Sequence, residues 1–409
     1  MTEAFIVATA RSPIGRARKG SLVDLRPDDL AAQMVAAALA AVPGLDPARV
    51  EDLLIGCGQP AGEQGNNLAR IVAVLLELDG VPGTTVNRYC SSSLQTTRMA
   101  FHAIKAGEGD VFVSAGVESV THYDRGAADV TPGVDVRNPR FAESWARTDA
   151  RAGGEASARP WRDPRDDGAL PDPYIAMGQT AENVAELMGV TRAEQDEFAA
   201  RSQQRAERAI ASGFWAREIT PVTLPDGRVV DADDGPRAGV TVEALAGLDP
   251  VFRADGTVTA GNCCPLNDGA AAVVVVSERI VDELGLQPLA RIVSTGVSAL
   301  SPEIMGLGPV DASRQALTRA GLSIDDIDLV ELNEAFAAQV IPSARELGID
   351  PERLNVHGGA IAVGHPFGMT GARITSTLLN GLAATGGRYG LETMCVGGGQ
   401  GMAMVVERV

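Results

Sequence analysis

The chain repeats one order of predicted elements in its two halves, and this repeat constrains its fold more than any other feature. Short apolar strands alternate with Ala-rich helices, an order typical of a mostly parallel sheet covered by helices. The corresponding segments are 28–58 with 311–336, 82–107 with 355–382, and 109–119 with 391–406. Chance similarity in a Gly- and Ala-rich chain is the alternative. A true duplication predicts a pseudo-twofold α/β enzyme with its site between the halves.

Composition and charge exclude several classes of protein. The longest apolar run, Met34–Val42, is far shorter than the about 20 residues of a membrane-spanning helix. The net charge of −18 argues against a nucleic-acid-binding surface. The N-terminus lacks the basic and long apolar parts of a secretory signal, and five cysteines are an odd number for a disulfide framework. We expect a cytoplasmic protein with no membrane and no nucleic-acid partner.

The segment 122–173 lies between the halves, is rich in Arg and Pro, and contains no clear strand. Its arginines are Arg125, Arg137, Arg140, Arg147, Arg151, Arg159, Arg162 and Arg165. Acidic residues interleave with them, so we expect most of these charges to be solvated rather than to form a phosphate site. Downstream, 180–188 and 191–212 are predicted amphipathic helices, and Thr180 is the expected N-cap of the first.

Cys90 is the first candidate nucleophile. It lies in VNRYCSSSLQ, after a predicted strand at 84–86 and in the first turn of a predicted helix at 91–105. Helix N-terminal amides stabilise an anion, so we expect a depressed thiol pKa, and the serines that follow can cap the helix. A thiolate is the nucleophile that acyl transfer needs. A buried, inert cysteine is the alternative.

Three further candidates lie in turns of the second half. His365, in GGAIAVGHPFG, is flanked by glycines that allow close approach of a substrate, and could accept a thiol proton or be purely structural. Cys395, in TMCVGGGQG, could be an acid–base group or a small apolar filler, and the glycine amides after it could form an anion hole. Asn333, in ELNEAF, could cap the next helix or hold a catalytic water.

Metal and nucleotide sites are both disfavoured. Cys263 and Cys264 are adjacent and, with His357, lack the spacing of a zinc ligand set. The chain has no Walker loop, and the glycine-rich segments 358–364 and 397–401 do not have the GxGxxG spacing of a dinucleotide site. We therefore expect no metal and no resident cofactor.

Five segments together resemble the thiolase family of acyl-CoA C-acyltransferases, and the resemblance covers nearly the whole chain. They are VNRYCSSSLQ around Cys90, TVTAGNCCPLNDGAAAVVV (257–275), LNEAFAAQ (332–339), NVHGGAIAVGHPFGMTGAR (355–373) and CVGGGQGMAMVVE (395–407). The resemblance implies a five-layered αβαβα fold built from two similar halves, with a loop domain inserted in the first. The implied spans are 1–119 plus 267–288 for the first half, 120–266 for the loop domain, and 289–409 for the second half.

The resemblance also implies a role for each candidate. Cys90 corresponds to the nucleophile that becomes acylated, and His365 to the base that activates it. Cys395 corresponds to the acid–base that moves the proton of the acetyl methyl group or of the CoA thiol. Asn333 corresponds to the residue holding a water that forms one oxyanion hole with His365. The backbone amides of Cys90 and Gly397 correspond to the second oxyanion hole.

Coenzyme contacts carry over less completely. Arg237 resembles the arginine near the adenine, and Met177 resembles a methionine beside the acyl pocket. Cys264 stands where serine is common and is placed with the coenzyme-binding residues. Ala176 replaces a histidine of some short-chain members, which predicts a wider pocket and substrates longer than acetoacetyl-CoA.

The resemblance implies cleavage of a 3-oxoacyl-CoA by CoA to acetyl-CoA and a shortened acyl-CoA, and the reverse Claisen condensation, in a ping-pong cycle through an acyl-cysteine. The expected activities are those of an acetyl-CoA acetyltransferase or a 3-ketoacyl-CoA thiolase of fatty-acid β-oxidation, in a homodimer or homotetramer. CoA is a substrate here, not a cofactor. A decarboxylating synthase is disfavoured by Cys395 and the GHP motif, and a non-catalytic acyl-CoA-binding protein by the intact catalytic residue types. Acyl chain length, ring character and physiological direction stay open.

Overall fold

Two groups of strands join edge to edge in a computed structural model that describes residues 2–123, 137–153 and 160–409. The strands of the first group, in spatial order, are β4 (Gly83–Val86), β3 (Asp52–Gly56), β5 (Val111–Ser119), β8 (Asn267–Ser277) and β1 (Ala4–Arg11), and β2 (Gly15–Arg16) pairs with β8. The second group continues with β9 (Ala290–Ala299), β12 (Gln400–Arg408), β11 (Tyr389–Val396) and β10 (Leu329–Leu332). Only Phe5 and Ile6 of β1 pair with β9, so the junction between the groups is short.

The predicted duplication is confirmed by strand order and direction. In the first group, β3 pairs parallel with β5, β5 antiparallel with β8, and β8 antiparallel with β1. In the second group, β10 pairs parallel with β11, β11 antiparallel with β12, and β12 antiparallel with β9. The two halves therefore share one topology, as the matched sequence segments indicate.

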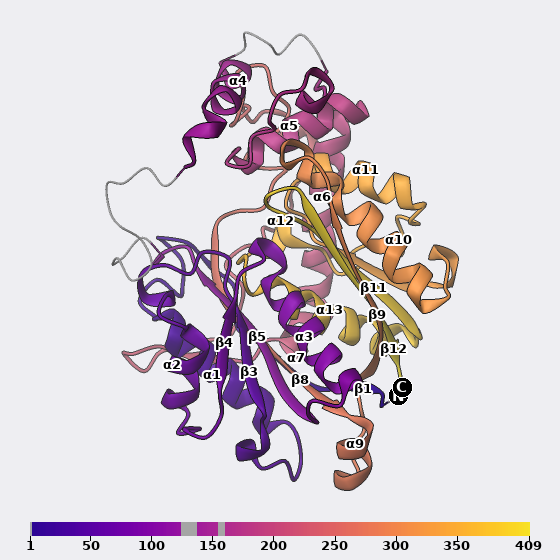
Figure 1. Ribbon diagram of the computed structural model, residues 1–409. Helices are drawn as coiled ribbons and strands as arrows, with labels where there is room; N and C mark the ends of the chain where they lie inside the picture. Colours follow the sequence, from indigo (N-terminus) through magenta and orange to yellow (C-terminus); the bar gives the residue numbers. More distant parts are fainter. Residues whose placement is uncertain (1, 124–136, 154–159) are drawn as a thin grey trace.

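Helices α3 (Ser92–Ala106) and α13 (Thr370–Thr385) form the middle layer between the two strand groups (Figure 1). Their side chains share one core with the inward faces of both groups. Glycine makes this close packing possible, because a Cβ on Gly371 would lie 2.3 Å from the Leu94 backbone nitrogen. A Cβ on Gly116 of β5 would likewise lie 2.1 Å from the Gly368 carbonyl oxygen.

Other helices cover the outer faces and complete the five layers. The first group is covered by α1 (Pro27–Ala40), α2 (Leu68–Leu75) and α9 (Glu278–Leu284), and the second by α10 (Gly308–Ala320) and α11 (Ala337–Leu347). Their apolar faces pack on the outer sides of the strands in two further cores. The expected αβαβα architecture is thus confirmed.

The segment between β5 and β8 adds mainly helices, and the first two α-helices of this segment lie above the strands in Figure 1. They are α4 (Ala142–Ala152), α5 (Met177–Met188), α6 (Arg192–Ala211), α7 (Phe214–Glu218) and α8 (Val242–Ala246), with a small hairpin of β6 (Val222–Thr223) and β7 (Val229–Val230). The division of the chain at 1–119 plus 267–288, 120–266 and 289–409 stays a prediction.

Short helices occupy many of the connections. They are α12 (Ala360–Val363) and the 3-10 helices η1 (Pro47–Arg49), η2 (Gly62–Gln64), η3 (Tyr89–Ser91), η4 (Pro139–Phe141), η5 (Pro164–Asp167), η6 (Pro302–Leu307) and η7 (Ile324–Asp326).

The expected N-cap at Thr180 is wrong. Helix α5 begins at Met177, because the backbone N–H groups of Gln179 and Thr180 both donate to the carbonyl of Ala176. The Thr180 hydroxyl donates to the Met177 carbonyl 2.6 Å away instead of accepting from an amide. Propensity placed the start one turn too late, and this puts Met177 itself at the first helical position.

The arginine-rich segment is only partly solvated. Arg140, Arg162 and Arg165 are exposed as expected, and Arg125 and Arg159 lie outside the described residues. Arg151 instead pairs with Glu186 at 2.5 Å, and Arg147 donates to the Leu170 carbonyl at 2.7 Å. Arg137 lies against an aromatic ring and lines a cavity that is described below.

Candidate active site

Cys90 lies in a tight turn between β4 and α3. The residue before it, Tyr89, has a φ of 44°, in the left-handed region that non-glycine residues rarely adopt. Ser92 holds the turn, since its hydroxyl accepts from the Arg88 N–H at 2.9 Å and donates to the Tyr89 carbonyl at 2.7 Å. Ser93 accepts from the Ala372 N–H at 2.9 Å, which ties this turn to α13. Ser92 and Ser93 therefore stabilise the strained turn, and, among the described residues, no serine side chain caps helix α3.

The expected depressed pKa of Cys90 is wrong. Burial, with a smaller contribution from the charge of nearby Glu118, raises the pKa of its thiol to about 12, although a backbone N–H of Gly397 directed at the sulfur acts to lower it. Desolvation of the thiolate thus outweighs the stabilising amides of the turn. The thiol is neutral at rest, so attack by its sulfur requires a proton acceptor.

His365 is held as the tautomer that can accept such a proton. Its Nδ1 lies 2.6 Å from the Thr370 hydroxyl, and that hydroxyl donates its own proton to the Pro366 carbonyl at 2.7 Å. The hydroxyl must therefore accept from Nδ1–H, which leaves the lone pair on Nε2. Burial, together with the positive charge of Arg373, lowers the pKa of His365 to about 3, so the imidazole is neutral.

Asn333 lies beside His365 rather than at a helix cap. Helix α11 begins four residues later, and its N-cap is Phe336. The Asn333 side-chain amide lies 3.3 Å from His365 Nε2 and, given the tautomer above, donates to it. Among the described residues, its buried Oδ1 has no hydrogen-bond partner. Asn333 thus contributes a donor, Nδ2, and an acceptor, Oδ1, to a buried polar site beside the His365 imidazole.

Three cysteines from different parts of the chain, Cys90, Cys264 and Cys395, lie near one another. Cys395, the penultimate residue of β11, is fully buried, and burial together with the proximity of Cys90 raises its thiol pKa well above the usual range. The pKa of Cys264 is raised by burial and by Cys263, Cys90 and Cys395. Cys395 is thus both a buried side chain of an apolar cluster and a neighbour of the candidate nucleophile.

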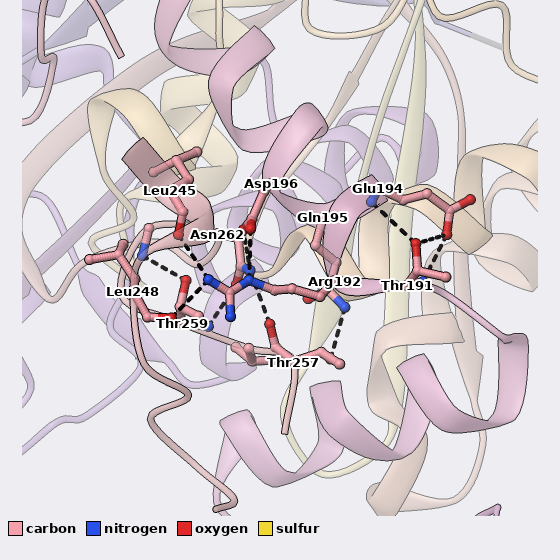
Figure 2. Close-up of polar contacts among 12 residues, drawn as sticks. Thr191, Arg192, Glu194, Gln195, Asp196, Leu245, Leu248, Thr257, Thr259 and Asn262 are labelled. Atoms are coloured by element: carbon pink, nitrogen blue, oxygen red, sulfur yellow. Dashed lines mark hydrogen bonds and ion pairs between the residues drawn. The ribbon is translucent and has the colours of Figure 1, made fainter. Parts of the chain in front are cut away.

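The segment before Cys264 is fixed to α6 by a polar network (Figure 2). Asn262 donates from Nδ2 to Asp196 at 3.0 Å and accepts from the Thr259 N–H at 2.8 Å. Asp196 also pairs with Arg192 at 2.7 Å, and Arg192 donates to the carbonyl of Leu245. A capping box between Thr191 and Glu194 starts the helix that carries these residues. The network holds the Cys263–Cys264 dipeptide against the second half, where the Cys264 N–H donates to the Ala335 carbonyl.

Glycines after Cys395 allow the chain to approach Cys90. Gly398 and Gly399 have φ values of 77° and 79°, which glycine adopts without strain. A Cβ on Gly397 would lie 3.2 Å from the Tyr89 ring. The absence of a side chain lets the Gly397 amide reach the Cys90 sulfur, as an oxyanion-hole donor requires.

A cavity of about 370 Å³ opens onto Cys90. Gly397 and Met177 line it with Cys90, and Phe367 packs edge-on against His365 with the ring centroids 5.2 Å apart. Ala176 is exposed and does not line the cavity. The predicted widening of the pocket by this residue is therefore not supported by a contact between Ala176 and the cavity. Among the described residues, no hydrogen bond joins His365 to Cys90, and such catalytic bonds often tighten only when substrate binds.

Arg237 lies elsewhere. With Arg16 and Cys263 it lines a second, small cavity of about 50 Å³. Its backbone N–H donates to the Gln203 side chain at 3.0 Å. The Cys263–Cys264 dipeptide thus connects the two regions, since Cys263 faces the cavity of Arg237 and Cys264 lies near Cys90 and Cys395.

Sequence reasoning missed Glu118, a fully buried carboxylate at the end of β5. It accepts from the N–H groups of Gly58 at 2.7 Å, Gln59 at 3.0 Å and Gly368 at 2.8 Å, and from Gln64 at 2.6 Å. Gly58 and Gln59 line the Cys90 cavity, whereas Gly368 follows the histidine loop of the other half. Glu118 therefore ties the walls from both halves together. An acid in the otherwise small and apolar run VFVSAGVES was the available signal.

The described residues hold no group of three or more His, Cys, Asp or Glu side chains placed to bind a metal ion. None of their helices is both long enough and apolar enough to span a bilayer.

The comparisons with known proteins agree with this geometry. Residues 4–279 match the thiolase N-terminal domain, and residues 286–408 match the thiolase C-terminal domain. The chain is 43% identical to the 3-oxoadipyl-CoA/3-oxo-5,6-dehydrosuberyl-CoA thiolase of Escherichia coli K12 and 42% identical to the 3-ketoacyl-CoA thiolase of Bacillus subtilis, over all of each chain. The crystal structure of the Bacillus anthracis acetyl-CoA acetyltransferase is similar, with a TM-score of 0.85, 38% identity, and coverage of 100% of this chain and 99% of that one.

Proposed function

The chain belongs to the thiolase family, and from that premise we propose that it cleaves 3-oxoacyl-CoA with CoA, and catalyses the reverse condensation, through an acyl-enzyme on Cys90. The observation that carries this proposal is that the candidate nucleophile and the candidate base are both neutral at rest. Cys90 keeps its proton beside the Gly397 amide, and His365 keeps a lone pair on Nε2.

In the first half-reaction, the Cys90 sulfur attacks the 3-oxo carbon while its proton passes to His365 Nε2. Because the pKa of Cys90 is about 12 and that of His365 about 3, a stable thiolate–imidazolium pair is disfavoured before substrate arrives. Proton transfer therefore accompanies attack, and donors such as the Gly397 amide stabilise the oxyanion that forms.

Collapse of this oxyanion breaks the C2–C3 bond, leaving the shortened acyl group on Cys90 and the enolate of acetyl-CoA. The Cys395 thiol protonates the enolate carbon, which releases acetyl-CoA. The Cys395 thiolate then takes the proton of an incoming CoA thiol, whose sulfur attacks the acyl-cysteine. Cys90 leaves as a thiolate and recovers its proton from His365, so each group returns to its starting state.

The two polar environments support two oxyanion sites. Asn333 Nδ2 lies 3.3 Å from His365 Nε2. Once Nε2 has taken the Cys90 proton, its N–H forms one oxyanion site together with a water held by Asn333. The amides of Cys90 and Gly397 form the other. In this proposal the acyl group occupies the cavity that Met177 lines, and the nucleotide end of CoA occupies the cavity of Arg237 and Arg16. Cys264, which lies near Cys90 and Cys395, borders the pantetheine arm.

Relatives of near-equal identity carry two substrate names, 3-oxoadipyl-CoA and 3-ketoacyl-CoA, so the general reaction is tested first. The purified protein is assayed for CoA-dependent loss of a panel of 3-oxoacyl-CoA thioesters, with acetyl-CoA measured as product. The proposal expects acetyl-CoA and the acyl-CoA shortened by two carbons in equal amounts. CoA-independent hydrolysis, or tight binding of every thioester without cleavage, would overturn it.

We also propose that the chain assembles as a homodimer or homotetramer, as the family resemblance implies. Closed symmetric assemblies are the commonest state of soluble oligomers. Sedimentation equilibrium at micromolar concentration is expected to give two or four times the chain mass of 42.4 kDa. A mass near 42.4 kDa would contradict the assembly.

A further inference from the structure

The Cys90 cavity contains a cation that the thiolase reaction does not use. Among the described residues that line it, Arg137 is the only one with a charged side chain. The other lining residues are apolar or aromatic side chains, glycines, the Cys90 thiol and the amide of Gln59. Glu118 lies behind Gly58 and Gln59 and is fully buried, where four N–H donors satisfy it. The cavity thus has a nucleophile and a guanidinium in one apolar space.

Arg137 is placed by an aromatic platform. Its guanidinium carbon lies 4.3 Å from the centroid of the Trp145 ring, a cation–π contact that holds the charge against this side chain. The neighbouring Asn138 N–H donates to the Tyr174 hydroxyl at 3.1 Å. Tyr174 packs edge-on against Trp145 with ring centroids 6.0 Å apart, and it lines the same cavity. The arginine is therefore docked on a wall of the acyl pocket.

The phosphates of CoA have basic groups in a different place. Arg16 and Arg237 line the second cavity, which the Cys263–Cys264 dipeptide connects to the reacting thiols. A pantetheine arm that passes Cys263 and Cys264 would reach Cys90 from that side. An anion at Arg137 then belongs to the other end of the substrate, the end of the acyl chain.

We propose that Arg137 binds a carboxylate at the end of the acyl group, so that the preferred substrate is a 3-oxo dicarboxylyl-CoA. This inference rests on the proposed thiolase function of the same cavity. A carboxylate that entered an apolar pocket without a cation would lose hydration without compensation, whereas a guanidinium can bind it with paired N–H donors. The cavity volume of about 370 Å³ falls in the range of small-ligand sites.

Arg137 is exposed at the rim, and this sets the size of the effect. A neutral acyl chain leaves the guanidinium in contact with water, so Arg137 favours the acid without excluding the neutral substrate. We expect a preference of about tenfold in kcat/KM, because the charge-assisted contact is partly screened by solvent.

The test compares 3-oxoadipyl-CoA with 3-oxohexanoyl-CoA, which have equal numbers of acyl carbons and differ in a terminal carboxylate or methyl group. Wild-type protein, R137Q, R137K and the exposed control R140Q are assayed for kcat/KM on both and for KM of CoA. R137Q is expected to lose about tenfold on the acid and less than about twofold on the neutral substrate. R137K should retain part of the preference, R140Q all of it, and KM for CoA should not change.

Two results would overturn the assignment. Equal losses on both substrates with a raised KM for CoA would place Arg137 with the CoA phosphates. An unchanged preference in R137Q would remove it from substrate selection. If wild-type protein cleaves neither thioester, the proposed function fails separately. Equilibrium binding of saturated adipyl-CoA and hexanoyl-CoA then still tests Arg137, since R137Q should weaken only adipyl-CoA, and equal binding of both by wild-type protein would contradict the proposal.

Discussion

The Thr370 hydroxyl lies 2.6 Å from His365 Nδ1, and this contact determines which imidazole nitrogen can take a proton. Thr370 belongs to the first turn of α13, and its own proton is committed to the Pro366 carbonyl. A helix of the middle layer thus holds the tautomer of a side chain that lies in a loop. The fold positions His365, and the Thr370 hydroxyl holds it in the tautomer that can accept a proton at Nε2.

Thr370→Val removes this hydroxyl while keeping the branched shape of the side chain. The imidazole can then move its proton to Nε2, and kcat/KM for thiolysis should fall at least about tenfold, since general-base catalysis is worth more than that. Thr370→Ser keeps the hydroxyl and should stay within about threefold of wild type. Steady-state assays over a pH range check this, and equal losses in both variants would show that packing, not the hydrogen bond, matters.

Alkylation of Cys90 reports whether a thiolate exists at rest. Because burial raises the pKa of this thiol to about 12, the rate with iodoacetamide should increase steadily from about pH 6 to about pH 9 with no plateau. Mass mapping of the modified peptide identifies the site, and His365→Ala should slow the reaction near neutral pH. A plateau that begins below pH 7 would demonstrate a preformed thiolate–imidazolium pair.

Cys395→Ala separates the two acid–base groups. Acyl transfer from acetyl-CoA to Cys90 needs only His365, so labelled acyl-enzyme should still form in this variant. Exchange of the acetyl methyl protons with D₂O needs a base at that carbon and should become undetectable by NMR. Exchange at the wild-type rate would assign the carbon acid–base step to another residue.

His357 makes the stability of the protein depend on pH. It stacks on Phe214 with ring centroids 3.5 Å apart, and burial lowers its pKa to about 4. Since the folded-state pKa lies below the unfolded value of about 6.5, protons bind the unfolded chain preferentially between these values. Stability should therefore be complete above about pH 6.5 and decline as the pH falls toward about 4.

His357→Asn removes this titration. In thermal melts monitored by circular dichroism, the Tm of the His357→Asn variant should fall less between pH 7 and about pH 5 than the Tm of the wild-type protein. The variant should keep some dependence of Tm on pH, because the pKa of His365 is also lowered. The measurement therefore compares the slope of Tm against pH in the variant with the slope in the wild-type protein. Identical slopes would mean that His357 is not desolvated in the folded state.

The sequence predicted the topology of the chain better than it predicted the electrostatics of the candidate site. The repeated order of elements anticipated the shared strand order of the halves, because apolar periodicity and turn residues act locally. The pKa of Cys90 could not be anticipated, since it depends on burial in the folded protein, on the Gly397 amide and on the charge of Glu118, which come from distant elements. A residue's exposure is a property of tertiary packing that its neighbours in sequence do not encode.

The same limit explains what was missed. Glu118 appears in sequence as an acid in a strand, and only the fold brings the Gly58 and Gly368 amides to it. Arg137 appears as one arginine among many interleaved with acids, and only its contact with Trp145 and its place in the Cys90 cavity distinguish it. The interleaving of acids and arginines along the chain thus does not indicate which charged side chains line a cavity.

The central claim is that Cys90 carries the acyl group, and one measurement tests it most directly. Protein incubated with radiolabelled acetyl-CoA is denatured, freed of unbound label, digested and analysed by mass spectrometry. We expect one acetyl group on the peptide that contains Cys90. CoA added before denaturation should remove this label, and Cys90→Ala should carry none. Acetyl label on the Cys264 or Cys395 peptide, or label retained in Cys90→Ala, would contradict the account.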